Sequence, residues 1–200
     1  MTISNSGIPA EIISAWDKAA TKCANPLGLD EKVLQDSLED CPPREYEGGT
    51  FLGRFLIPRS FVVYDEQDQP RQKGCDPNHV TNLYNNYIVK EYMTTEEPPI
   101  ASFNDGVLNS SILKPHSGFN RYKALDRLGQ EIYIYDVYEF ESRYWEVIAA
   151  SASNHHSNPQ LSQTNEDYLK VVTNAVKAQI IPSDEDSIKD FVNKIATDKT

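Results

Sequence analysis

Lys114-Pro115-His116-Ser117-Gly118-Phe119-Asn120-Arg121-Tyr122-Lys123-Ala124-Leu125 reads as the end of a strand, a tight glycine turn and the start of a helix. The preceding residues 107–113 are apolar and β-prone around a polar centre. After the turn, apolar residues recur at helical spacing up to Leu128, and Gly129 supplies a stop signal. The stretch therefore predicts a strand, a turn and a helix in direct succession.

The turn has the chemistry of a small anion site. Ser117 is the candidate N-cap of the helix, and Gly118 lets the backbone approach a ligand closely. The N–H groups of the first helical turn, the helix dipole and the guanidinium of Arg121 all attract negative charge. Phosphate is the obvious anion. The physics alone leaves an ordinary strand–helix connection as an equal alternative, because a glycine turn before a helix is common.

Segments on both sides of this turn resemble those of a known superfamily. In chain order they are the strand Phe55-Leu56-Ile57-Pro58, the pair Pro70-Arg71, a helix over 77–90, a Pro-Ile strand over 98–103, the Gly-x-x-Arg turn at 118–121 and a closing strand over 131–137. Over residues 54–140, their order and spacing are similar to the N-terminal domain of the ParB/sulfiredoxin superfamily. The resemblance implies an α/β (α+β) fold with a small mixed β-sheet and helices.

The same resemblance implies a phosphate-binding or nucleotide-binding role for several side chains. In that superfamily the Gly-x-x-Arg turn and the arginine of the Pro-Arg pair hold the phosphate of a nucleotide or nucleic acid. An asparagine after the last strand completes the pocket. The residues of this chain at or within those motifs are Arg71, Ser117, Gly118, Phe119, Asn120, Arg121 and Asn154.

Two departures from the superfamily patterns narrow the expected chemistry. Sulfiredoxins carry Gly-Gly-Cys-His-Arg at the turn, whereas this chain has no cysteine there, which argues against sulfinic-acid reduction. ParB proteins that use CTP show Gly-Glu-Arg-Arg, and here Phe119 and Asn120 replace the middle pair. The loss of a carboxylate and an arginine argues against CTP hydrolysis and clamp closure.

The charge balance limits the expected affinity for nucleic acid. The 200 residues include 19 Lys and Arg against 30 Asp and Glu, a formal net charge of −11. Residues 51–127 hold nine basic and nine acidic residues, so the acidic excess lies in residues 1–50 and 128–200. A polyanion could dock on the neutral centre, but the overall field disfavours strong non-specific binding.

No feature of the sequence points to a membrane or to secretion. No apolar run approaches the length of a membrane span, and the first residues lack the basic and apolar regions of a signal peptide. Cys23, Cys41 and Cys75 are scattered and lack the spacing of metal ligands, which is typical of a reducing compartment. We therefore expect a soluble, cytoplasmic protein with no membrane partner.

Hydrophobic periodicity divides the chain into three parts. Residues 1–50 form a helical N-terminal extension, residues 51–152 the ParB/sulfiredoxin-like core, and residues 153–200 a C-terminal helical extension packed on the core. The N-terminal helices either pack on the core or mediate formation of a homo-oligomer. The two C-terminal helices could be read as a helix-turn-helix, but DNA phosphates would repel the acidic residues 184–186 that open the second helix.

Two histidines are the candidates for catalytic proton transfer. His116 directly precedes the turn and is expected at the rim of the pocket, and His156 follows Asn154 in a polar loop. A structural role for His116 and a solvated one for His156 are the alternatives. No acidic pair, including any with Asp105, has the spacing of metal ligands, so no protein metal site is predicted. Mg²⁺ enters only as the candidate companion of a bound nucleotide.

Three functions fit these observations. The first is a phosphate-handling domain acting on nucleic acid, specifically a ParB-like DNA nuclease or nucleotide hydrolase in which Arg71 and Arg121 neutralise phosphate. The second is a nucleotide-binding switch for CTP or ATP, or a small-molecule kinase-like module, which the acidic surface favours modestly. The third is a non-catalytic binding or assembly protein that has kept the fold.

Overall fold

The computed structural model describes residues 7–64, 75–90, 94, 96–103, 111–153 and 164–197. Its elements are α1 (Ala10–Ala20), α2 (Glu31–Asp40), β1 (Gly49–Pro58), the short 3-10 helix η1 (Arg59–Phe61), α3 (Pro77–Lys90), β2 (Ile100–Phe103), β3 (Leu113–Pro115), α4 (Phe119–Leu128), β4 (Ile132–Phe140), α5 (Arg143–Ser153), α6 (Asn165–Lys177) and α7 (Glu185–Thr197). The predicted α/β (α+β) class is confirmed. None of the described helices has the length and apolar character needed to cross a membrane.

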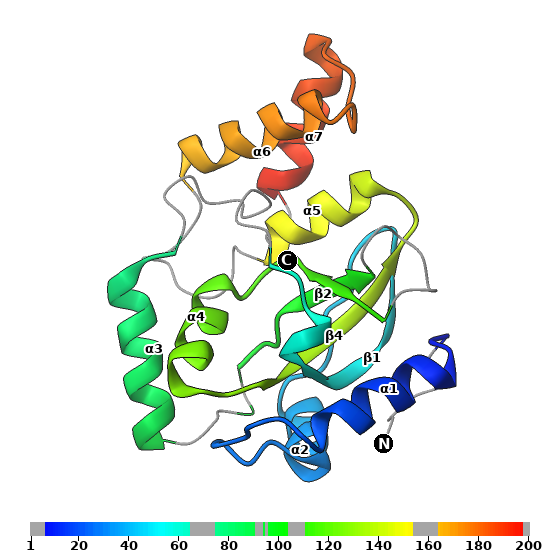
Figure 1. Cartoon of the computed structure of the whole chain (residues 1–200). Helices are drawn as coiled ribbons and strands as arrows, with labels where there is room; N and C mark the ends of the chain where they lie inside the picture. Colours follow the sequence, from blue (N-terminus) through cyan, green and yellow to red (C-terminus); the bar gives the residue numbers. More distant parts are fainter. Residues whose placement is uncertain are drawn as a thin grey trace.

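A four-stranded mixed sheet in the order β1-β4-β2-β3 forms the centre of the molecule (Figure 1). β1 and β4 are antiparallel, with Gly49 opposite Phe140 and Pro58 opposite Ile132. β2 runs parallel to β4 and antiparallel to β3. Because the chain returns from β3 to β4 through α4, the predicted glycine turn lies at the start of this return.

Helices cover both faces of the sheet, and the side chains of each strand alternate between them. The face toward α1, α3 and α4 carries the main core, which includes Ile12, Trp16, Phe55, Tyr87, Phe103, Leu125, Tyr133, Tyr135 and Val137. On the opposite face, Ile134 contacts Leu34 of α2, and Tyr138 packs with Ala149 and Ala152 of α5. The N-terminal helices therefore pack on the core, and their role in self-association stays a prediction.

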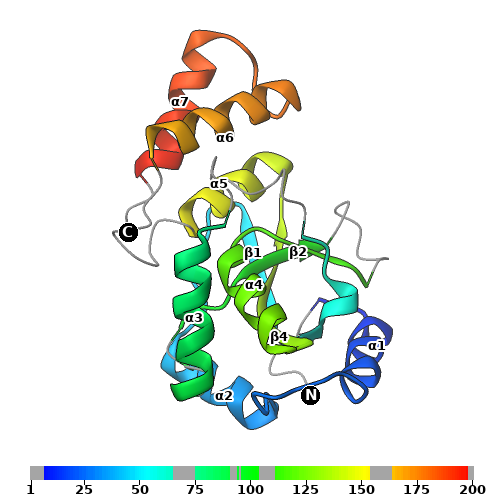
Figure 2. The same ribbon diagram turned by 60° about the vertical axis from the view of Figure 1, so that its left-hand side comes forward.

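The helices α6 and α7 lie beyond α5 at one end of the molecule (Figures 1 and 2). Phe191 and Ile195 of α7 pack with Ile148 of α5 in a separate apolar cluster. The Lys194 ammonium lies 4.7 Å from the centre of the Trp145 ring and also pairs with Glu47. These contacts join the C-terminal helices to the rest of the chain, whereas the predicted boundaries near 50 and 152 stay predictions.

Two predicted elements differ from the observed ones. The closing strand predicted over 131–137 is longer in the structure, where β4 continues to Phe140. The cause is a continued alternation: Tyr138 faces the core opposite Phe51, and Phe140 stacks on Tyr138. The strand before the turn is shorter than predicted and comprises Leu113–Pro115, while residues 107–110 lie outside the described part of the chain.

Candidate functional site

The glycine corner is held against the start of β2. Gly118 is the N-cap of α4 and has φ +80°, which glycine adopts without strain. A Cβ at this position would lie 2.6 Å from Pro99 Cβ, so the close approach here is to Pro99. The prediction that Ser117 caps the helix is wrong, because its Oγ accepts a hydrogen bond from the Ile100 amide at 3.0 Å.

The three residues after Gly118 each contact a different neighbour. Phe119 is buried edge-on against Tyr64, with ring centroids 4.9 Å apart. Asn120 Oδ1 accepts a hydrogen bond from the Asp76 amide at 3.0 Å. Arg121 Nη1 donates to the Glu97 carbonyl at 2.8 Å, and its Nε lies 3.5 Å from the Glu96 carboxylate. Phe119 and Asn120, which stand in place of the Glu-Arg pair of the Gly-Glu-Arg-Arg motif, therefore serve packing and helix docking.

Helices α3 and α4 begin side by side. At their starts, the amide of Asp76, next to Pro77, is bound by Asn120. Further along, the Arg127 guanidinium of α4 lies 4.2 Å from the centre of the Tyr84 ring of α3. Since early residues meet early ones and late residues meet late ones, the two helices run in the same direction. Their positive dipole ends therefore converge.

The start of α4 is the more open of these two ends to an anion. Asp76 already accepts hydrogen bonds from amides in the first turn of α3, and Asp30, Thr164 and Asp184 do the same at α2, α6 and α7. Gly118 gives α4 no such side chain, and the first turn of α4 contains no acidic residue. The partial positive charge of this helix end is therefore not offset by its own sequence.

A hollow of about 340 Å³ lies beside the first turns of α4. It is lined by Val62, Val63, Tyr64, Cys75, Phe119, Tyr122 and Lys123. Its volume falls at the lower end of the range found for small-molecule sites. Tyr64 and Cys75 flank residues 65–74, the stretch that carries Arg71, so both described ends of that stretch line the hollow.

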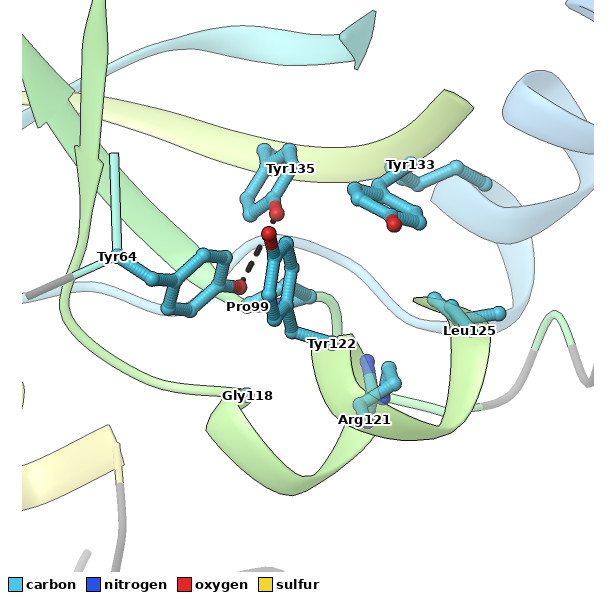
Figure 3. Close-up of a pocket in the computed structure, with 9 residues that line it drawn as sticks. Tyr64, Pro99, Gly118, Arg121, Tyr122, Leu125, Tyr133 and Tyr135 are labelled. Atoms are coloured by element: carbon cyan, nitrogen blue, oxygen red, sulfur yellow. Dashed lines mark hydrogen bonds between the residues drawn. The ribbon is translucent and has the colours of Figure 1, made fainter. Parts of the chain in front are cut away.

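A second, much smaller cavity shares Tyr64 and Tyr122 with the hollow (Figure 3). It measures about 10 Å³, room for about one water, and Gly118 and Arg121 also line it. Inside it, Tyr64 Oη and Tyr135 Oη are hydrogen-bonded at 3.0 Å, whereas the buried Tyr133 Oη has no hydrogen-bond partner among the described residues. Burial raises the pKa of all three tyrosines, so they remain neutral at physiological pH.

His116 lies inside the protein, and the expectation that it sits at the pocket rim is wrong. Its side chain is 5% exposed because its ring packs behind the strand end, with Nε2 2.8 Å from Ser102 Oγ and 3.0 Å from Glu146 Oε1. Ser102 Oγ also donates to the same carboxylate oxygen at 3.1 Å. His116 thus joins β3 to β2 and α5, which supports the structural alternative.

The Ser102, His116 and Glu146 side chains do not form a nucleophile–base–acid relay. In such a relay the serine and the carboxylate contact different ring nitrogens; here both contact Nε2. Burial alone would raise the pKa of the Glu146 carboxyl, but the hydrogen bond and charge of His116, with a further contribution from Arg143, lower it to about 2. Glu146 is therefore ionised, so Nε2 carries a proton toward it and cannot activate Ser102.

Several predicted site residues lie outside the described part of the chain. They are Arg71, Asn154 and His156, together with the acidic candidate Asp105. Among the described residues, no group of three or more His, Cys, Asp or Glu side chains is placed to hold a metal ion. The roles of these four residues, and of Mg²⁺ beside a nucleotide, stay predictions.

The aromatic and acidic neighbours of the corner were not predictable from the sequence around Gly118. Tyr64, Pro99 and Glu96 reach it from segments that lie 19 or more residues away in the chain, so no local pattern connects them to Gly118. By contrast, helical spacing could have predicted Tyr122 as a neighbour of the site, because it follows Phe119 by three positions and therefore lies on the same face of the helix. Both residues line the hollow.

Comparisons with known proteins identify the fold. No family model matches the chain, and no curated protein matches it. Among solved structures, one crystal form of a Pnob8-like ParB-N domain matches with a TM-score of 0.51 at 14% identity, over 74% of this chain and 62% of that one. This chain thus spans less than two thirds of that relative's length. The predicted ParB-like fold is confirmed.

Two structures of the C-terminally truncated chromosome-partitioning protein ParB from Caulobacter crescentus also match. The complex with CTP-γ-S is 16% identical with a TM-score of 0.43, over 73% of this chain and 76% of that one. The complex with the centromeric parS site is 14% identical with a TM-score of 0.42, over 70% and 64% of the two chains. These are weaker matches, and the sequence identity throughout is that of a shared fold.

Proposed function

We propose that this chain, a domain with the ParB-like fold, binds a nucleoside polyphosphate in the hollow beside α4. The observation that carries this proposal is the meeting of an open helix start with an aromatic wall. Gly118 leaves the first-turn amides of α4 without a capping side chain, and Tyr64, Phe119 and Tyr122 line the adjoining hollow. A nucleotide needs both kinds of surface.

The phosphate end of the ligand would lie at the start of α4. Amides of a first helical turn and the dipole behind them favour an anion, and charged donors strengthen the interaction. Arg121 lies in the same turn, and Lys123 lines the hollow. The superfamily resemblance adds Arg71, whose contribution is a prediction from its motif.

The base of the ligand would lie against the aromatic wall. The rings of Tyr64 and Tyr122 are 4.0 Å apart and those of Tyr64 and Phe119 are 4.9 Å apart, so the wall is a continuous packed surface. Aromatic side chains stack on any nucleobase with little sequence preference. We therefore expect the phosphate end to contribute more to affinity than the identity of the base.

A free nucleotide suits this chain better than a nucleic-acid polymer. The net charge of −11 opposes a long polyanion, which must neutralise many phosphates along its contact surface. For the nuclease alternative, the part of the chain that the structure describes offers no metal-ligand cluster, and His116 is engaged with Glu146. Nuclease activity is therefore an alternative outcome of the experiment below.

A thermal-shift titration tests the proposal. Nucleoside triphosphates with and without Mg²⁺ should raise the melting temperature, and a ligand at a hundred times its dissociation constant stabilises by about 2.7 kcal/mol. The shift should disappear in Arg121→Ala and persist in Arg127→Ala, which removes the same side chain from the far end of α4. A shift with oligonucleotides alone, or plasmid nicking lost in Arg121→Ala, would favour the nuclease.

The three cysteines provide a second, site-specific readout. Cys75 lines the hollow, whereas Cys23 and Cys41 lie elsewhere and serve as internal references. Alkylation followed by peptide mass spectrometry should show that a bound nucleotide slows the modification of Cys75 relative to the two references. Equal protection of all three cysteines would indicate general stabilisation, and no protection of Cys75 would contradict binding in the hollow.

A further inference from the structure

We infer that Glu96 is a built-in competitor of the ligand, which occupies Arg121 until a phosphate group replaces it. The inference rests on the proposed nucleotide site and adds a regulatory step to it. Three residues carry it: Arg121 in the first turn of α4, Glu96 in the segment that leads into β2, and Tyr87 in α3.

Arg121 binds protein partners and also lines the small cavity, which shares Tyr64 and Tyr122 with the hollow. Its Nη1 donates to the Glu97 carbonyl at 2.8 Å, and its Nε lies 3.5 Å from Glu96 Oε2. The same side chain lines the small cavity together with Gly118. Arg121 can therefore keep its bond to the backbone while it exchanges the carboxylate for a phosphate oxygen.

The partial burial of this ion pair strengthens the competition between Glu96 and a ligand anion. The Arg121 side chain is 16% exposed and that of Glu96 is 23% exposed, so water screens their interaction only in part. The Glu96 carboxylate stabilises the partly buried charge of Arg121 when no ligand is bound. It also competes directly with any other anion, because one guanidinium edge cannot serve both.

Glu96 connects the site to α3. The same Oε2 that faces Arg121 accepts a hydrogen bond from Tyr87 Oη at 3.2 Å, and the ring of Tyr87 is buried in the core. Departure of Glu96 from Arg121 therefore changes a link between α3 and the segment before β2. Ligand occupancy would in this way be transmitted to a helix that also begins beside the hollow.

Replacement of Glu96 separates this inference from its alternatives. Nucleoside triphosphate affinity should increase roughly fivefold in Glu96→Gln, the size expected for loss of a partly screened ion pair. Glu96→Asp keeps the charge but shortens the side chain by one methylene, and it should bind more tightly than the wild type too. Glu97→Gln is the matched control, since Arg121 binds the backbone carbonyl of this residue, which the substitution keeps.

Isothermal titration calorimetry measures the nucleoside triphosphate affinity of the wild type, Glu96→Gln, Glu96→Asp and Glu97→Gln, and each possible result supports or overturns the inference. Tighter binding in both Glu96 variants, with Glu97→Gln within about twofold of wild type, supports the inference. Binding by Glu96→Gln alone would also support the inference, because it would mean that the Glu96 carboxylate prevents detectable binding in the wild type. Unchanged affinity in the Glu96 variants, or an equal gain in Glu97→Gln, overturns the competition while nucleotide binding stands. If none of the four proteins binds a nucleotide, the proposed function itself fails.

Discussion

Arginine pairs with a carboxylate on each side of the sheet, and the two pairs are built differently. On the α2 side, Arg54 and Asp136 form two short bonds of 2.6 and 2.7 Å, and their side chains are 0% and 3% exposed. On the α4 side, Arg121 meets Glu96 at one distance of 3.5 Å with both side chains partly exposed. The first pair is a fixed part of the interior, whereas the second is the pair that we infer to exchange partners.

The remaining contacts of Arg54 explain its permanence. Its Nη1 donates to the Ser37 carbonyl at 2.6 Å, to Ser37 Oγ at 3.1 Å and to the Cys41 carbonyl at 2.8 Å. These acceptors lie at the end of α2, where a helix leaves carbonyl groups without intrahelical partners. One guanidinium thereby closes a helix, joins two strands and neutralises a buried carboxylate. The difference lies in burial and distance: a guanidinium with short bonds in the interior is part of the structure, whereas one in a longer, partly exposed pair is the candidate to bind a ligand.

Replacement of the two arginines should give the largest difference. Arg54→Met leaves Asp136 as an uncompensated buried charge, and we expect a loss of about 3–5 kcal/mol in the free energy of unfolding. Arg121→Met should lose about 1 kcal/mol or less. Urea denaturation of both variants measures the contrast, and equal losses would contradict it. The double variant Arg54→Met with Asp136→Leu should recover part of the loss, because it removes both charges.

Glu146 tests whether another largely enclosed carboxylate contributes to stability as the fixed pair does. Its pKa is lowered to about 2, so its contribution to stability is complete above the unfolded value near 4.5 and is lost as the pH falls from about 4.5 toward 2. The loss amounts to about 3 kcal/mol at most. Glu146→Gln should flatten the stability profile in this window, whereas Glu139→Gln, an exposed position, should not. An unchanged slope in Glu146→Gln would contradict the assignment.

The corner that presents Arg121 should itself be rigid, and glycine replacements test this. Gly118 and Gly129 begin and end α4 with φ of +80° and +75°, so alanine costs backbone strain of about 1 kcal/mol at either place. At Gly118 the new Cβ also meets Pro99, whereas nothing lies within 4 Å at Gly129. We expect thermal unfolding to show a loss of about 1–3 kcal/mol for Gly118→Ala, clearly above that of Gly129→Ala. Similar losses would mean that Pro99 moves away easily.

The smallest expected effect lies in the tyrosines behind Arg121. Tyr135→Phe removes the hydroxyl bond to Tyr64 and should cost about 1 kcal/mol. Tyr133→Phe removes a buried hydroxyl that has no hydrogen-bond partner among the described residues, so stability should stay the same or rise slightly. Denaturation midpoints of the two variants give the comparison. A clear loss in Tyr133→Phe would show that its hydroxyl is bound in solution.

Local chemistry made much of the fold predictable. Several helix termini coincide with capping residues that are recognisable from the local sequence. They are Asp30 before α2, the Asp76-Pro77 start of α3 and Gly129 after α4. The glycine corner followed from its sequence for the same reason. The extension of β4 to Phe140 did not, because strand length depends on the pairing with β1.

The partners in the site were less predictable than its backbone. Glu146 comes from a helix 30 residues after His116, and Asp136 lies 82 residues from Arg54, so only the folded sheet brings these groups together. Ser117 was predicted as a cap from its position before the helix. Its hydroxyl instead binds the Ile100 amide, because β2 begins beside the turn. Long-range pairing decided each of these outcomes.

The contact between Lys194 and Trp145 supplies an optical signal. Trp16 is enclosed in the main core, so its emission should stay constant while the core is intact. Trp145 instead has the ammonium of a distant helix over its ring, and separation of α7 from α5 would remove that charge and admit water. Undocking of the C-terminal helices should therefore appear as a red shift of half the tryptophan signal before the core melts.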